Sequence, residues 1–199
     1  APASRETDLL RPENTVEAIH AVCLSGGSAF GLEAASGVAR ELEARGIGLD
    51  VGPTRVPIVC SSCIFDLAFG SASVRPGVEE GIEATRAALE ADPSPLAEGT
   101  VGAGTGATVG KLNGAATLMK GGLGARARAI GDLKIGAIAV VNACGNVVDP
   151  ATGAPIAGMR AAADSLEIVD MEDAMLAAAE DLAMPLDRTN TTISCIITN

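Results

Sequence analysis

The segment from residue 188 to residue 199 constrains the fold more than any other part of the sequence. A polar stretch that ends at Asn190 changes at once into an apolar run, rich in β-branched residues, from Thr192 to Thr198. Alternating side chains of this kind favour a β-strand. We therefore predict that Thr191 lies at the mouth of a sheet, where the strand begins, and that Asn190 lies just outside it.

The predicted position of Thr191 suits a reactive hydroxyl. A threonine that begins a strand after a short polar loop could attack the carbonyl of the residue before it, and water would then open the ester. Cleavage would leave Thr191 with a free α-amine, whose unperturbed pKa of roughly 7.7 to 8.0 suits a general base near neutral pH. Taken alone, the same residues are far more often simply a turn that enters a strand. Residues 190–192 also match an N-glycosylation acceptor, although nothing else in the sequence favours secretion.

Composition limits the class of protein. The chain has 199 residues, 48% of them hydrophobic, with 24 glycines and a positive mean hydropathy, which predicts one core-forming domain or a domain that lacks a piece. With three Phe and no Trp or Tyr, little is available to stack on nucleobases. The net charge of −11 repels phosphate backbones and anionic membranes. We therefore expect no nucleic-acid partner and no membrane partner.

The cysteines and the apolar runs indicate a cytoplasmic protein. No run of about 18 uncharged apolar residues occurs, and no export leader is visible at Ala1. The five cysteines are odd in number and predict a reduced set of thiols. Cys60 and Cys63 have the spacing of a redox or zinc pair, but there is no second pair, and His20 is the one histidine. We expect no metal.

Hydrophobic periodicity predicts alternating helices and strands. Ser28 would cap a helix that ends near residue 45, a second helix would span residues 79–91, and a third, capped by Asp170, would span residues 171–183. Strands are predicted at residues 18–24, within the apolar stretch 56–67, and at residues 135–141. Residues 120–124 read as a loop, and residues 142–150 read as the turn and return strand of a hairpin.

A glycine-rich stretch at residues 99–111 resembles a phosphate-binding loop without matching one. The Walker pattern requires Gly where Thr105 stands and Ser or Thr where Leu112 stands. The dinucleotide fingerprint lacks a strong preceding strand and a following helix. We predict a glycine-lined strand with Lys111 as a charge at its end. Asn142, at the end of the strand 135–141, has an amide that could donate to a developing oxyanion, although such residues are more often turn formers.

Several sequence blocks occur in a characteristic order. They are residues 4–10 (SRETDLL), 24–32 (LSGGSAFGL), 56–58 with 64–67 (VPI, IFDL), 99–102 (GTVG), 120–124 (KGGLG), 140–143 with 145–150 (VVNA, GNVVDP) and 190–193 (NTTI). The succession covers nearly the whole chain. It resembles the DmpA-type family of N-terminal-nucleophile hydrolases, which includes L-aminopeptidase/D-esterases, β-peptidyl aminopeptidases and the nylon-oligomer endo-hydrolase.

The resemblance implies an α/β fold, a four-layer α/β/β/α sandwich of the DmpA and ornithine acetyltransferase type. Residues 1–199 would form a single, incomplete hydrolase domain, in which residues 1–190 are the α piece and residues 191–199 begin the β piece. The two pieces would stay together after self-cleavage and form a homo-oligomer of αβ units. The remaining β piece would be a partner, and it would supply the further groups that act on the nucleophile.

The resemblance also assigns roles to residues. It places the cut between Asn190 and Thr191 and makes Thr191 the nucleophile. Asn142 matches the oxyanion asparagine of the family, and Lys111 matches a lysine near the nucleophile of the nylon-oligomer hydrolase. Phe65 and Ser28 would belong to the substrate pocket. Phe65 stands where several characterised members have a tyrosine, so one polar contact to the substrate or oxyanion is lost.

We therefore expect an amide hydrolase that needs no cofactor, acting as an aminopeptidase on short peptides or on β- or D-amino amides and esters. Two alternatives stay open. One is acyl transfer of the ornithine acetyltransferase type, in which an amine instead of water resolves the ester. The other is a non-catalytic, self-assembling subunit, in which Thr191 is an ordinary strand start.

Overall fold

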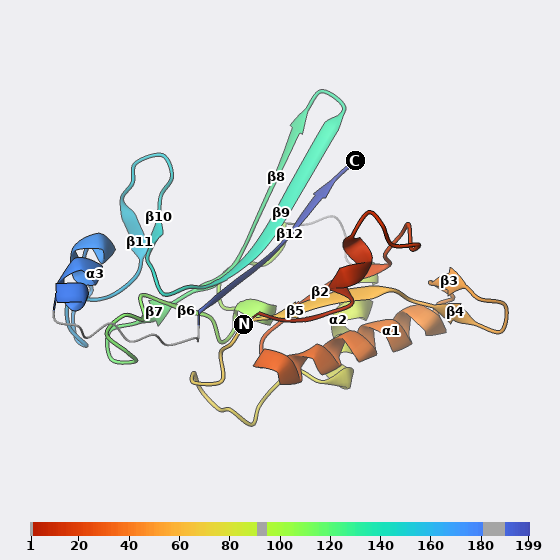
Figure 1. Ribbon diagram of the computed structural model, residues 1–199, viewed down its shortest axis with the longest axis horizontal. Coiled ribbons are helices and arrows are strands. Elements are labelled where there is room, and N and C mark those ends of the chain that lie inside the picture. The colour runs from red at the N-terminus through yellow and green to blue at the C-terminus, as the bar shows by residue number, and fades with distance from the viewer. Residues whose placement is uncertain (1, 91–94, 181–189) are drawn as a thin grey trace.

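Two three-stranded sheets form the centre of the computed structural model, which describes residues 2–90, 95–180 and 190–199 (Figure 1). The first sheet has the order β1-β5-β2, in which β1 (Ala3–Arg5) is antiparallel and β2 (Ala21–Ser25) is parallel to β5 (Val59–Cys63). Parallel neighbours require a crossover connection. Here the crossover consists of the 3-10 turn η2 (Ser28–Glu33) and helix α1 (Ala34–Ala44).

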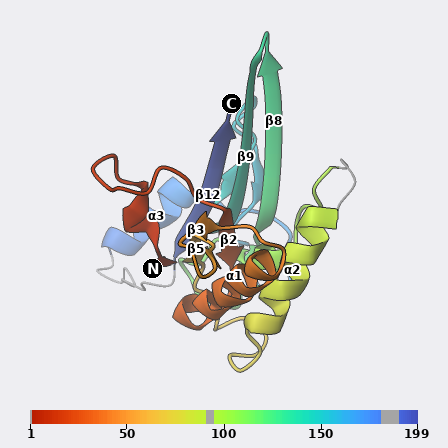
Figure 2. The ribbon, with the colours of Figure 1, turned by 90° about the vertical axis from the view of Figure 1, so that its right-hand side faces the viewer.

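The second sheet is antiparallel and has the order β12-β9-β8. Its strands are β8 (Gly122–Ile130), β9 (Leu133–Asn142) and β12 (Thr191–Thr198), and both predicted strands in this region are confirmed. Figures 1 and 2 show the hairpin of β8 and β9 extending away from the helices. The prediction of a loop at residues 120–124 is wrong, because Gly122 and Gly124 pair with Val141 and Ala139 of β9.

The predicted hairpin between β9 and residues 147–150 is also wrong. Both edges of β9 are already occupied by β8 and β12. The strand β10 (Val147–Val148) therefore pairs with β11 (Pro155–Ala157) instead. The remaining short elements are η1 (Thr7–Leu10), η3 (Gly102–Gly104), the pair β3 (Leu49–Asp50) and β4 (Arg55–Val56), and the pair β6 (Thr108–Val109) and β7 (Met119–Lys120).

Apolar side chains join these elements into a helical layer and two sheet layers. The sheets pack on each other through a core that contains Ile64, Val140 and Ile193. On the other face of the first sheet, Val38 and Leu42 of α1 pack against Val59. Helix α2 (Val78–Glu90) lies beside α1 (Figure 2). The α/β class predicted from the sequence is confirmed.

Glycines set the close approach of the two helices. An added Cβ at Gly37 of α1 would lie 2.9 Å from Ile82 N, and an added Cβ at Gly81 of α2 would lie 2.9 Å from Ala34 C. Real Cβ atoms do not approach backbone atoms so closely. The two helices can therefore cross at this distance only because both positions lack a side chain.

The helices agree with the predictions except at one start. The helix predicted from Ser28 begins as a 3-10 turn and becomes α-helical at Ala34, and Ser28 makes no capping bond with its side chain. Ser28 has φ 55°, in the left-handed region, because the chain turns tightly through Gly26 and Gly27. An N-cap residue is normally extended, so the expected cap geometry is not available.

The other two predicted helices are present. Helix α2 begins one residue before its predicted start, and residue 91 lies outside the described residues. Helix α3 (Met171–Glu180) is capped as predicted, since Asp170 Oδ1 accepts from the N–H groups of Glu172 and Asp173 at 2.8 and 3.2 Å. Its predicted end, residues 181–183, also lies outside the described residues. Across the part of the chain that the structure describes, no helix has the length and apolar character needed to cross a membrane.

The prediction of a glycine-lined strand at residues 99–111 is wrong for most of this stretch. Gly99, Gly102 and Gly110 have φ values of 87°, 49° and 68°, which a strand does not allow. The stretch therefore forms η3 and then the two-residue strand β6.

Glu41 of α1 forms one ion pair with Arg45 at the end of its own helix and one with Arg86 of α2, and the second pair connects the two helices. Glu41 Oε1 lies 2.8 Å from Arg45 Nε, and its Oε2 lies 3.0 Å from the guanidinium of Arg86 on α2. Hydrogen bonds from Arg86 and then from Arg45 lower the pKa of Glu41. A carboxylate whose pKa falls on folding stabilises the folded state above its unfolded pKa of about 4.3. That contribution is lost as the pH falls through the lower, folded pKa.

We predict that Glu41→Gln lowers the free energy of unfolding at pH 7, and that the difference from wild type shrinks by about pH 3 as the wild-type carboxylate becomes protonated. Glu83→Gln, at an exposed position of α2, is the matched control and should change stability little at either pH. Urea denaturation at both pH values measures the effect. An equal deficit at pH 7 and pH 3 would contradict the prediction.

Candidate active site

The register of the second sheet places the side chain of Thr191 beside that of Asn142. The two residues are cross-strand partners in the antiparallel β12–β9 ladder, so their side chains share one face. Thr191 is 4% exposed and Asn142 is fully buried. Thr191 Oγ1 accepts hydrogen bonds at 3.0 Å from Asn142 Nδ2 and at 3.0 Å from the backbone N–H of Phe65. The predicted strand start is confirmed, and exposed Asn190 lies just outside it.

The carboxamide of Asn142 connects β9 to three other segments of the chain. Its Nδ2 donates to Phe65 O at 2.7 Å as well as to Thr191 Oγ1. Its Oδ1 accepts from Lys111 Nζ at 2.6 Å and from the backbone N–H of Thr108 at 3.0 Å. Because both partners of Oδ1 are donors only, the amide oxygen must face them and the amide nitrogen must face Thr191.

Lys111 acts on this arrangement from the side of the amide oxygen. Its Nζ donates to the backbone carbonyl of Asn142 at 3.0 Å in addition to Oδ1, and its own backbone N–H donates to Cys144 O at 2.9 Å. A positively charged group that donates to the amide oxygen polarises the carboxamide and strengthens hydrogen-bond donation by its nitrogen. The structure therefore brings Lys111, Asn142 and Thr191 together, and their catalytic roles stay a prediction.

Phe65 contributes its backbone to the site. Its N–H and its carbonyl contact Thr191 and Asn142, and the next residue, Asp66, fixes the position of this segment. Asp66 Oδ1 accepts from the backbone N–H of Gly27 at 2.7 Å. An added Cβ at Gly26 or Gly106 would lie 3.2 or 2.7 Å from Asp66 Cγ. The carboxylate thus sits between two glycines and ties together the loops that follow β2 and β5 and the loop that precedes β6.

Sequence reasoning missed Thr108 and Asp66. Thr108 contributes a backbone N–H, which every residue except proline offers, so no sequence signal marks it. Asp66 stands directly after Phe65 within an apolar stretch. A single carboxylate among apolar residues was the sequence feature that could have marked it as a candidate site residue. Ser28 lies next to the segment that contains Phe65, since its backbone N–H donates to Ile64 O at 2.9 Å.

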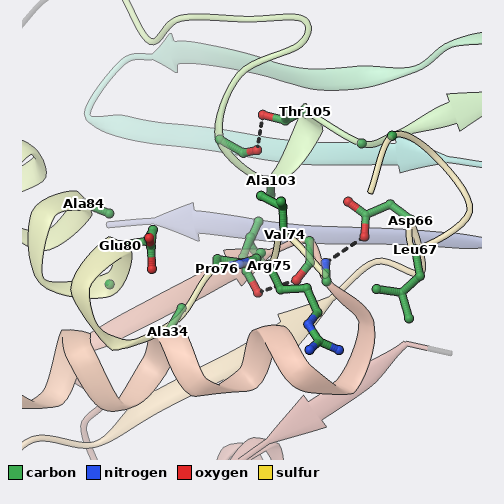
Figure 3. A pocket seen from close by; sticks show the side chains of 18 of the residues that line it. Ala34, Asp66, Leu67, Val74, Arg75, Pro76, Glu80, Ala84, Ala103 and Thr105 are labelled. Carbon is green, nitrogen blue, oxygen red and sulfur yellow. Dashed lines mark hydrogen bonds between the residues drawn. The ribbon is translucent and has the colours of Figure 1, made fainter. Parts of the chain in front are cut away.

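A cavity of about 550 Å³ lies beside the site (Figure 3). Asp66 and Leu67 lie at one side of it, and Glu80 and Ala84 of α2 lie at the opposite side. Gly27 and Asp66 line this cavity, whereas their neighbours Ser28 and Phe65 are not among its lining residues in the described part of the chain. The assignment of Ser28 and Phe65 to a substrate pocket stays a prediction.

Comparison with known proteins identifies the family. The family model of peptidase family S58 matches residues 1–199. The chain belongs to peptidase family S58. The predicted resemblance to the DmpA-type hydrolases is thereby confirmed.

Curated relatives support the same family. The chain is 41% identical over 203 residues to a Mycobacterium leprae protein named as an uncharacterized aminopeptidase, covering 100% of this chain and 54% of the relative. It is 44% identical over 200 residues to a Mycobacterium tuberculosis protein of the same description, covering 99% and 54%. A 6-aminohexanoate-oligomer endohydrolase of Paenarthrobacter ureafaciens is 37% identical over 181 residues, covering 90% and 49%. The chain spans about half the length of these relatives.

Three thiols of this S58 chain, those of Cys23, Cys60 and Cys63, are poorly suited to be nucleophiles. All five cysteines are free. Burial raises the pKa of Cys23, Cys60 and Cys63, which disfavours the reactive thiolate near neutral pH. Among the described residues, no group of three or more His, Cys, Asp or Glu side chains is placed to hold a metal ion.

We predict that Gly106→Ala destabilises the protein by about 1 to 3 kcal/mol, because the new methyl group would displace the Asp66 carboxylate. The matched control is Gly124→Ala in β8, where an added Cβ meets no atom within 4 Å. Urea denaturation of the two variants measures the difference. Equal stability of Gly106→Ala and Gly124→Ala would show that Asp66 is not confined as described.

Proposed function

We propose that the protein is a self-processing amide hydrolase whose nucleophile is Thr191, released at the N-terminus of a β piece by cleavage between Asn190 and Thr191. The observation that supports this proposal is the hydroxyl oxygen of Thr191, which lies 3.0 Å from each of two N–H donors at the first position of a strand. Two donors on one oxygen stabilise the negative charge that develops there when the hydroxyl loses its proton.

In the processing step, Thr191 Oγ1 attacks the carbonyl carbon of Asn190. The C–N bond between the two residues breaks, the nitrogen takes up a proton, and the acyl group of Asn190 becomes an ester on Oγ1. Water then hydrolyses the ester. The products are a carboxylate on Asn190 and a free α-amine and hydroxyl on Thr191.

In turnover, the α-amine of Thr191 accepts the proton of its own hydroxyl as Oγ1 attacks the substrate amide. The tetrahedral intermediate collapses, the proton passes to the departing amine, and an acyl ester remains on Thr191. A water molecule, activated by the same α-amine, releases the acid. Nucleophile and base are thus one residue, and no cofactor enters either half-reaction.

Asn142 and Lys111 support both reactions. Asn142 Nδ2 holds Oγ1 before attack, and it faces the region in which the oxyanion forms. Lys111 acts through the carboxamide oxygen of Asn142, 2.6 Å from its ammonium group, so we describe it as a positioning and polarising residue. The Phe65 backbone N–H reaches Oγ1 whichever side chain stands at this position, so the absence of a tyrosine hydroxyl leaves this contact intact.

We propose a small peptide or amide as substrate, including short peptides and β- or D-amino amides and esters. The relatives named as aminopeptidases and as a 6-aminohexanoate-oligomer endohydrolase support a linear amide. We further propose a cytoplasmic homo-oligomer of αβ units. In it, the remaining β piece would complete a four-layer α/β/β/α sandwich on the second sheet.

We predict that full-length Thr191→Ala remains a single chain and is inactive, because it has no oxygen nucleophile, whereas Thr191→Ser is cleaved and retains part of the activity. Mass spectrometry of the purified proteins should show fragments that divide between residues 190 and 191 in wild type and Thr191→Ser. Cleavage that persists at this bond in Thr191→Ala would remove Thr191 from its proposed role. An added amine acceptor distinguishes hydrolysis from acyl transfer, since transfer would give an acylated amine.

We predict that Asn142→Ala slows both cleavage and hydrolysis by about 10²- to 10³-fold, the range found when one oxyanion donor is removed. The matched control is Asn146→Ala, because Asn146 donates to Val169 O and accepts from Met159 N away from Thr191. Time courses of cleavage and steady-state rates measure the effect. Similar rates for the two variants would contradict a role of Asn142 in the chemistry.

A further inference from the structure

The loop of residues 66–76, which follows Phe65 directly, contributes much of the lining of the cavity beside the site. Asp66, Leu67, Phe69 and residues 74–76 of this loop line the cavity, and its other walls come from residues 23–27, from Ala34, from α2 and from η3 with the residues that follow it. Figure 3 shows Val74, Arg75 and Pro76 projecting between the two sides of the cavity. The walls are formed mainly by aliphatic side chains, one phenylalanine and glycine backbone.

Two cation–π contacts hold this loop near its two ends. Lys120 Nζ lies 4.0 Å from the centre of the Phe69 ring and donates to Thr105 O at 2.7 Å. At the other end, Arg75 Cζ lies 3.9 Å from the centre of the Phe30 ring. Contacts of this kind contribute about 0.5 to 2 kcal/mol each, depending on desolvation. The loop is therefore fastened to β7 at one end and to η2 at the other, with the cavity between them.

The charged residues of the lining are already engaged by the protein. Asp66 accepts from Gly27 N–H at 2.7 Å, and Glu80 accepts from Gly77 N–H at 2.8 Å. The guanidinium of Arg75 stacks on Phe30. A charged ligand group would compete with these contacts and lose hydration in a mostly apolar space. An uncharged apolar group meets neither cost.

The cavity is connected to the nucleophile by one short stretch of backbone. Phe65 N–H contacts Thr191 Oγ1, and the next residue, Asp66, lines the cavity. A group bound against Asp66 and Leu67 is thus close to an amide held at Thr191. The volume of about 550 Å³ falls within the usual range of small-molecule sites and exceeds what one short side chain needs.

We infer that this cavity binds an uncharged apolar group of the substrate that flanks the scissile amide, an aliphatic or aromatic side chain or acyl chain. The inference rests on the proposed function for its substrate role, but the binding site itself does not require catalysis. Phe69, Val74 and Ala84 would contact the bound group, and loop 66–76 would determine its size.

Binding is tested with hexanamide as the probe and full-length Thr191→Ala as the protein, so that the probe is not consumed. We expect saturable binding by ligand-observed NMR titration. Hexanoate and hexylamine should bind at least about tenfold more weakly, because each carries a charge into apolar surroundings. Equal or tighter binding of either charged probe would overturn the inference.

Ala84→Phe locates the binding site. Ala84 is an exposed residue of α2 that lines the cavity, so a phenyl ring there fills the space without entering the core. It should weaken hexanamide binding at least about tenfold. Ala87→Phe, at an exposed position of the same helix that does not line the cavity, is the matched control and should bind as the parent does. Equal affinities of the two variants would place the probe elsewhere.

Activity separates this inference from the proposed function. In protein with Thr191 intact, Ala84→Phe should lower the ratio of kcat/KM for leucine p-nitroanilide to kcat/KM for alanine p-nitroanilide by about tenfold. Hexanamide binding in the cavity together with undiminished hydrolysis by Thr191→Ala would refute the proposed function and leave the site standing. Hydrolysis that depends on Thr191, with an unchanged substrate ratio in Ala84→Phe, would refute the inference and leave the function standing.

Discussion

The candidate site depends on one buried carboxamide that is held in a single orientation. Asn142 is fully buried, and its two ends face different kinds of partner, donors at Oδ1 and acceptors at Nδ2. Rotation by 180° would set N–H against N–H and oxygen against oxygen. Each buried polar group left without a partner costs about 1 to 3 kcal/mol, so the rotated state is strongly disfavoured. The orientation that aims an N–H at Thr191 is therefore maintained by three segments that are distant in sequence, at Phe65, at residues 108–111 and at Thr191.

Backbone geometry supplies much of the remaining arrangement. Phe65 reaches Thr191 and Asn142 with main-chain atoms, and Thr108 reaches Asn142 in the same way. Such contacts need the chain to be placed correctly, and Asp66 places it by filling the space between Gly26 and Gly106. Small residues at these positions let loops from three elements meet at one carboxylate. This is a physical reason for a glycine-rich chain to build a site with few polar side chains.

The sequence predicted the ends of the important strands but not how they meet. β-branched runs mark β9 and β12, and their polar ends mark Asn142 and Thr191, because strand pattern is a local property. The antiparallel register that makes those two residues partners depends on the whole ladder. Local reasoning also failed at residues 120–124, where pairing with β9 outweighs the turn preference of glycine, and at Ser28, where a tight turn excludes the expected cap. The roles of Thr108 and Asp66 arise from contacts across many residues of sequence, which spacing does not show.

The environment of Thr191 also explains why, in the proposed mechanism, nucleophile and base are one residue. A hydroxyl oxygen accepts through two lone pairs, and Phe65 N–H and Asn142 Nδ2 supply two donors. The hydroxyl proton must then leave in a third direction. These neighbours are donors and cannot accept it, and Lys111 adds positive charge behind Asn142. Cleavage before Thr191 creates an amine two bonds from the carbon that bears the hydroxyl, at a distance fixed by covalent geometry. In the proposed mechanism, the reaction that frees the chain end thus produces a proton acceptor that neither of the two described donors to Oγ1 can be.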